Sequence, residues 1–108
     1  MTKERGNTGK AVNLKNMIEY GRGAIVSKTV LEKKHGDLSV FAFDAGQGLS
    51  EHTSPYEAVV QVLDGEALLT VGGKPVRVKA GELAIMPATV PHAVTAKKRF
   101  KMLLTLVK

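Results

Sequence analysis

From residue 24 onward the chain is a succession of short apolar runs separated by turn residues. The runs predict eight strands, at residues 24–31, 38–44, 57–63, 66–71, 76–79, 83–86, 92–95 and 100–107. Two-residue turns, Asp64-Gly65 and Gly72-Gly73, join neighbouring runs in the way that β-hairpins require. Because eight strands leave little room for helix, the pattern predicts an all-β sandwich or barrel.

Two of the predicted strands carry apolar residues on both faces. In the strand at residues 57–63, Ala58, Val60 and Val62 share one face, and the other face is also partly apolar. The strand at 100–107 repeats this composition. One apolar face fills the interior of a barrel, and the second needs a cover from outside. We therefore expect a homodimer.

The amino-terminal region has a different pattern. Residues 1–12 are mostly polar and lack periodicity, so we expect a flexible arm followed by a single domain at residues 13–108. Asn13 is placed to cap a short helix, because Leu14 and Ile18 then lie on one helical face.

Composition restricts the classes of function. The 108 residues are 44% hydrophobic and 24% charged, as in one ordinary globular domain. Without cysteine, any metal must be held by nitrogen and oxygen. No signal peptide and no apolar run of about 20 residues is present, so we expect a cytoplasmic protein that does not contact membranes. The net charge of +6 comes from scattered basic residues, and we expect no nucleic-acid binding. The densest basic cluster, at 97–101, is expected to be a solvated loop.

The candidate chemistry lies in two glycine-anchored segments, each with one histidine. In the first, five residues separate Gly46 from His52, and twelve separate His52 from Gly65. In the second, ten residues separate Gly81 from His92.

These spacings resemble the two motifs of the cupin superfamily, in the small single-domain form (cupin 2 type) of the conserved barrel proteins of prokaryotes. The first cupin motif has two histidines and a glutamate, and these positions hold His52, Ser54 and Ala58. In the second motif the histidine is His92, and Thr89 replaces a glycine. The resemblance implies an all-β cupin barrel (a double-stranded β-helix, or jelly roll) in which the two histidines point into one cavity. The short N-terminal helix expected from the residue pattern would precede this barrel.

A second register of the first motif is open. With His52 as the second histidine, Ser50 takes the first position and Glu57 takes the position of the glutamate. This register needs one extra residue before Gly65, which a β-bulge can absorb, and it turns Val60 outward.

The remaining donors fall short of a catalytic metal site, which generally has three protein ligands. We expect at most a weakly bound divalent transition metal at His52 and His92, joined by Glu57 only in the second register. The same cavity can take a small organic ligand. The candidate residues for this pocket are His52, His92, Ser54, Gln47 and Tyr56.

Two functions are compatible with these residues. The first is a small-molecule-binding or regulatory module with a degenerate metal site that retains two histidines. The alternative is a metal-dependent cupin enzyme, an oxygenase or isomerase, that uses His52 and His92 with weak additional ligands. No serine nucleophile, phosphate-binding loop or pair of acids is present, so no catalytic residue is assigned and the question of catalysis stays open.

Overall fold

The computed structural model describes residues 8–108, and the chain within this range is built almost entirely from strands. The elements are η2 (Leu14–Asn16), β1 (Ile25–Lys33), β2 (Gly36–Phe43), β3 (Gly48–His52), β4 (Glu57–Asp64), β5 (Glu66–Val71), β6 (Lys74–Lys79), β7 (Leu83–Met86), β8 (His92–Thr95) and β9 (Phe100–Val107). Every strand that the sequence pattern predicts is present. The pattern misses β3, a mostly polar strand.

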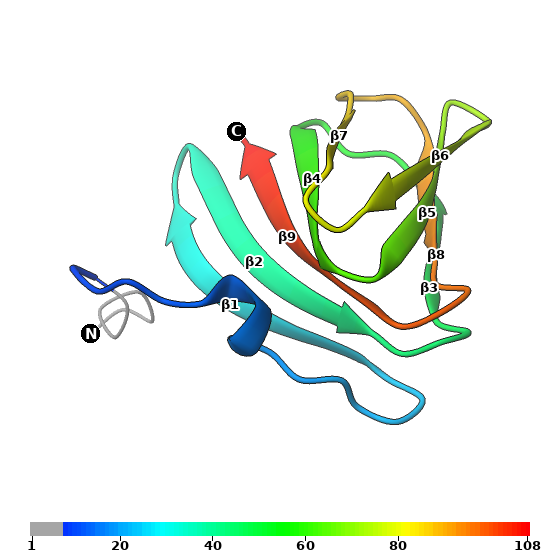
Figure 1. The fold of residues 1–108 in the computed structure, drawn as a ribbon. Helices are drawn as coiled ribbons and strands as arrows, with labels where there is room; N and C mark the ends of the chain where they lie inside the picture. Colours follow the sequence, from blue (N-terminus) through cyan, green and yellow to red (C-terminus); the bar gives the residue numbers. More distant parts are fainter. Residues whose placement is uncertain (1–7) are drawn as a thin grey trace.

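The strands form two antiparallel sheets that enclose the interior of a barrel (Figure 1). The larger sheet has the order β1-β2-β9-β4-β7, and the smaller has the order β3-β8-β5-β6. Several neighbours in each sheet are distant in sequence, as in a jelly roll. The predicted all-β barrel is therefore confirmed.

The core fills the space between the two sheets. Phe43 of β2 and Phe100 of β9 are entirely buried, and their rings stack with centroids 4.6 Å apart. Val60 of β4 and Leu69 of β5 are also entirely buried. Because alternate side chains of a strand face opposite sides of the sheet, this packing determines which residues point into the barrel.

The N-terminal segment packs on the outer face of the larger sheet. Ile18 is 4% exposed and packs in one cluster with Val40 and Leu103. The expected short helix is only a single 3-10 turn, although Asn13 caps it by accepting a hydrogen bond from the backbone N–H of Asn16 at 3.2 Å. The segment before Gly21 is too short to offset the cost of nucleating an α-helix.

The predicted flexible arm at 1–12 lies mostly outside the described residues; its positions 8–12 are exposed. Within residues 8–108 no helix has the length and apolar character needed to cross a membrane.

The strand β3 contains an irregularity that matters for the site. Leu49 pairs with Val94 of β8, and the next pair is His52 with His92, so β3 has one residue more than its partner over this stretch. Such a bulge reverses the alternation of side chains beyond it. As a result Leu49 and His52, three positions apart, both line the same cavity.

Candidate functional site

The two histidines lie side by side on neighbouring strands. His52 at the end of β3 is directly paired with His92 at the start of β8. Their ring centroids are 4.4 Å apart, with an edge-to-face angle of 71°. His92 is 3% exposed, whereas His52 is exposed, so one imidazole is buried and the other stands nearer to solvent.

Backbone carbonyls orient both imidazole rings. The Nδ1 atom of His52 lies 2.7 Å from the Ser50 carbonyl oxygen, and the Nδ1 atom of His92 lies 3.2 Å from the Val90 carbonyl oxygen. A carbonyl oxygen only accepts, so each Nδ1 must carry the proton and donate it. In the neutral form this leaves each Nε2 as an acceptor for a ligand.

The histidines line a cavity of about 280 Å³ inside the barrel. The lining residues are Leu49, His52, Ser54, Ala58, Met86, His92, Val94, Met102, Leu104 and Leu106. Apart from the two imidazoles and the hydroxyl of Ser54, these side chains are apolar. The cavity therefore combines an apolar wall with a small polar group of residues.

The strand β4 determines which residue of the first segment faces the cavity. Ala58, Val60 and Val62 are buried on its inner face, whereas Glu57 and Gln61 are exposed. Ala58 lines the cavity and Glu57 does not. The side chains of β4 are thus oriented as the first register requires. The carboxylate of Glu57, which the second register would use, lies on the other side of the sheet.

Two other candidate residues lie away from the cavity lining. The backbone carbonyl oxygen of Gln47, just before β3, accepts a hydrogen bond from the N–H of Ala96, just after β8, at 2.9 Å. Tyr56 is 38% exposed, and the Lys108 ammonium lies 5.5 Å from its ring centroid. The structure therefore brings together only three of the five candidates, namely His52, His92 and Ser54.

The sequence pattern does not reveal that β9 supplies part of the site. Met102, Leu104 and Leu106 occupy alternate positions of this strand, so they share one face. This alternation is the available signal, but it does not distinguish a cavity wall from an ordinary core.

The loop before β8 contains a strained residue. Thr89 has φ of 66°, in the left-handed region that disfavours β-branched side chains. Its N–H donates to the Ser54 carbonyl oxygen at 2.8 Å, and this hydrogen bond holds the segment after β3 against the loop. The strained conformation thus helps to position Ser54.

The donor set does not fit a catalytic metal site. The cavity offers two imidazole nitrogens and the Ser54 hydroxyl, whose oxygen already accepts a hydrogen bond from the Tyr56 N–H at 3.1 Å. Within residues 8–108 no three His, Cys, Asp or Glu side chains are grouped as metal ligands. Catalytic sites of this kind generally need three protein ligands.

Comparison with known proteins identifies the family. The family model for the cupin domain, Cupin_2, matches residues 39–107. A conserved protein of unknown function from Streptococcus pyogenes is 34% identical, with a TM-score of 0.87 over 93% of this chain and 88% of that one. The chain belongs to the cupin family, as a small single-domain conserved barrel protein.

Other solved structures share the fold. A cupin 2 conserved barrel domain protein from Leptotrichia buccalis is 46% identical, with a TM-score of 0.87, and the match covers 90% of this chain but only 47% of that one. A mutant form of salicylate 1,2-dioxygenase from Pseudoaminobacter salicylatoxidans is 14% identical, with a TM-score of 0.71 over 77% of this chain and 26% of that one. At 14% identity the likeness shows the fold alone. Among curated proteins, none matches the chain.

Proposed function

We propose that this cupin is a binding module whose barrel cavity takes a small organic ligand with an apolar body and a hydroxyl or anionic group. The observation that supports this function is the pair of imidazoles, 4.4 Å apart, beside an otherwise apolar wall. A neutral imidazole accepts a hydrogen bond from a ligand hydroxyl through Nε2, and a protonated imidazole donates one to an anion. An apolar wall with a few polar groups is typical of ligand pockets.

The volume restricts the ligand. An apolar cavity of about 150 Å³ accommodates benzene, so a cavity of about 280 Å³ has room for about ten non-hydrogen atoms. A hydroxylated or carboxylated aromatic ring is of this size.

Titration of the ¹⁵N-labelled protein with three ring compounds tests the function. Phenol and 3-hydroxybenzoate should shift the amide signals of cavity residues such as Leu49, Ala58 and Val94, and toluene should do so more weakly. Replacing an imidazole by a ring without nitrogen, as in His52→Phe, should remove the preference for the hydroxylated compounds.

Val12→Ala, at an exposed position that lies outside both the cavity and the outer face of β7, is the matched control and should leave the titrations unchanged. If none of the three compounds perturbs the cavity residues, or if toluene binds as tightly as phenol, the proposed function is wrong.

A second candidate, a metal-dependent enzyme, is favoured by one observation. Histidines that bind metal usually donate the other ring N–H to a carbonyl or carboxylate, and both His52 and His92 make such a contact. A divalent transition metal held weakly by these two residues is the form this candidate takes. Elemental analysis of protein purified without chelator decides between the two. Near-stoichiometric metal that is lost in His52→Ala or His92→Ala would favour the enzyme.

We also propose that the protein is a homodimer through the outer face of β7 and β4. Leu83 and Ile85 of β7 are 55% and 56% exposed, and Ile85 is paired with Val59 of β4. Exposed large apolar side chains grouped on one sheet face are typical of an interaction surface. A second copy of the chain offers a matching apolar surface.

A further inference from the structure

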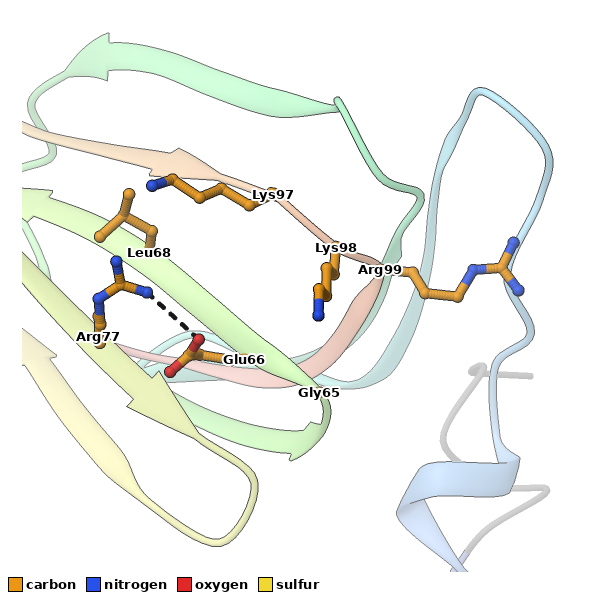
Figure 2. Close-up of a pocket in the computed structure, with 7 residues that line it drawn as sticks. All are labelled: Gly65, Glu66, Leu68, Arg77, Lys97, Lys98 and Arg99. Atoms are coloured by element: carbon orange, nitrogen blue, oxygen red, sulfur yellow. Dashed lines mark hydrogen bonds and ion pairs between the residues drawn. The ribbon is translucent and has the colours of Figure 1, made fainter.

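A second hollow lies on the outer side of the smaller sheet, separate from the barrel cavity (Figure 2). Its volume is about 590 Å³, and it is lined by Gly65, Glu66, Leu68, Arg77, Lys97, Lys98 and Arg99. In β5 the residues Ala67 and Leu69 are entirely buried inside the barrel, so Glu66 and Leu68 face outward. The two hollows therefore lie on opposite sides of one sheet and share no residue.

The charges around this hollow are not balanced. Arg77, Lys97 and Lys98 are cationic, and Glu66 is the single carboxylate among the lining residues. Arg99 is directed away, toward Asp44, with a contact of 3.1 Å (Figure 2). Three cations against one carboxylate leave an excess of two positive charges.

The ion pairs in the hollow are weak or missing. Arg77 and Glu66 approach to 3.4 Å, but both side chains are well exposed, at 58% and 40%. Exposed pairs of this kind contribute little to stability, because water screens the attraction. Within residues 8–108, neither Lys97 nor Lys98 has an ion-pair partner. Figure 2 shows Lys97 extending beside Leu68, and Lys98 pointing toward the start of β5, next to Gly65.

The loop that carries the two lysines is anchored at both ends. Ala96 is 1% exposed, and its carbonyl oxygen accepts a hydrogen bond from the Gly46 N–H at 2.7 Å. At the other end Phe100 is entirely buried against Phe43. The backbone between Ala96 and Phe100 is thus held in place before any ligand arrives.

Gly65 brings this loop against the start of β5. Its φ is +75°, and a Cβ added there would lie 2.5 Å from the Arg99 carbonyl oxygen. Only glycine allows this approach, because the contact with backbone cannot relax by a change of rotamer. Sites with positions fixed in advance lose less conformational entropy on binding.

We propose that this hollow binds a small organic dianion, a phosphate monoester or a dicarboxylate, that carries an apolar group. The two negative charges match the excess of positive charge, since a phosphate monoester carries about −1.5 to −2 at neutral pH. Leu68, half-buried, and the aliphatic stem of Lys97 provide an apolar surface for the remainder of the ligand. The volume is within the range of about 300–1,000 Å³ for ligand pockets.

Calorimetry and NMR titration with phenyl phosphate and phthalate test the proposal, and the ratio of the two dissociation constants shows which kind of dianion the hollow prefers. Both compounds should shift the amide signals of Gly65, Leu68, Lys97 and Lys98. Benzoate, with one charge, and inorganic phosphate, without a ring, should bind more weakly, and phenol should leave these signals in place. Equal shifts of these four amide signals by phenol, or shifts by the dianions confined to the barrel cavity, would overturn the proposal.

Matched variants separate this site from a general effect of charge. The double variant Lys97→Ala/Lys98→Ala should weaken phenyl phosphate binding about ten-fold or more. Lys28→Ala/Lys34→Ala removes the same charge from exposed positions elsewhere and should change it less than about two-fold. Equal losses in both double variants would mean that no specific site exists.

Glu66→Gln removes the one negative charge in the hollow. It should tighten phenyl phosphate binding about three-fold, because repulsion of the dianion is lost. Weaker binding in this variant would mean that Glu66 supports the site, contrary to the proposal. His52→Phe should leave the shifts that phenyl phosphate causes at Gly65, Leu68, Lys97 and Lys98 unchanged, so the tests of this site and of the barrel cavity are independent.

Discussion

The hydroxyl of Tyr20 donates a hydrogen bond of 2.6 Å to the carboxylate of Asp64, a residue 44 positions further along the chain. The same carboxylate lies 3.4 Å from the Lys15 ammonium. Lys101, 8% exposed, donates to the Lys15 carbonyl oxygen at 2.7 Å, and the Arg99 guanidinium lies 4.5 Å from the centroid of the Tyr20 ring. These contacts, more than local helix formation, hold the N-terminal segment on the larger sheet.

Tyr20→Phe should lower the free energy of unfolding by about 1–2 kcal/mol, since it removes the hydrogen bond donor of a charge-assisted pair. Urea denaturation followed by circular dichroism measures this loss. Tyr56→Phe is the matched control, because Tyr56 is 38% exposed and its change should stay within about 0.5 kcal/mol. Equal stability of Tyr20→Phe and the wild type would show that the hydrogen bond contributes nothing.

Stability should decrease in acid. The hydrogen bond from Tyr20, with the neighbouring Lys15, lowers the pKa of Asp64, and the hydrogen bond from the Gly23 N–H, with Arg99, lowers the pKa of Asp44. A carboxylate whose pKa is lowered in the folded state stabilises the fold above its unfolded pKa of about 3.9. This stabilisation is lost as the pH falls through the folded-state pKa. Denaturation midpoints should therefore be constant between about pH 5 and 8 and fall below about pH 4. Asp64→Asn should make this acid decline shallower.

Stability should also decrease in strong alkali. Burial, and then the hydrogen bond to Asp64, raises the pKa of Tyr20, and the contact with Asp37 raises the pKa of Lys108. A group whose pKa is raised in the folded state contributes its full stabilisation below its unfolded pKa, about 10 for these groups. This stabilisation is lost as the pH rises through the folded-state pKa. Thermal unfolding between about pH 8 and 12 measures the decline. Tyr20→Phe should reduce it, and an unchanged decline would exclude Tyr20 as its source.

Restoring two ligands should create a metal site. Ser54 and Ala58 line the cavity with both histidines, so Ser54→His together with Ala58→Glu places four donors around it. Affinity for Zn²⁺ or Mn²⁺ should rise on the order of 100-fold over the wild type. Ser50→His is the control, because it completes the ligand set only in the second register, with the exposed Glu57. A larger gain from Ser50→His would reverse the choice of register.

Thr89→Gly should stabilise the fold by about 1 kcal/mol, because glycine adopts positive φ without the steric cost that threonine has there. Thr89→Ala is the control and should give no comparable gain, since alanine keeps a Cβ. Thermal denaturation of the two variants distinguishes relief of backbone strain from the loss of the hydrogen bond that Thr89 Oγ1 donates to the Ala88 carbonyl oxygen at 2.6 Å. If Thr89→Gly lowered the stability, Thr89 would not be strained at its positive φ.

Ile85→Lys should convert the proposed dimer to a monomer, because it puts a charge in the middle of an apolar contact. Light scattering after size-exclusion chromatography gives the mass. Val12→Lys is the control, an exposed apolar residue at 43% on a different part of the chain, and it should keep the dimer mass. A monomeric wild-type protein would refute this assembly.

Periodicity predicts the barrel well because buried strands alternate. Ala58 and Val60 are inside as the pattern at 57–63 requires. The strand β3 escapes the pattern for a physical reason: Leu49 and His52 face the same side only because of the bulge, which no alternation rule contains. The spacing of the two glycine-anchored segments predicts that His52 and His92 share one cavity, and both line it. Gln47 and Tyr56 are expected near the cavity from sequence proximity alone, and neither lines it.

The basic cluster at 97–101 shows what the sequence pattern could not predict. The pattern predicts one solvated loop, but the fold gives these residues different environments. Lys101 is buried under the N-terminal segment and Arg99 pairs with Asp44, whereas Lys97 and Lys98 line an outer hollow. The anchoring of Ala96 and Phe100 determines this division, and those contacts are distant in sequence.

The bulge in β3 controls where the proton sits on His52 rather than whether the two histidines meet. Deleting Ser50 or Glu51 would give β3 a regular register in which His52 still opposes His92. In a regular ladder, however, backbone carbonyls are directed at the neighbouring strand, whereas the residue in excess at a bulge is left unpaired. The bulge therefore leaves the Ser50 carbonyl oxygen available to the Nδ1 of His52. A single-codon deletion would keep both imidazoles in place but remove the hydrogen bond that fixes the proton on Nδ1 of His52. The Nε2 atom would then no longer be fixed as the acceptor.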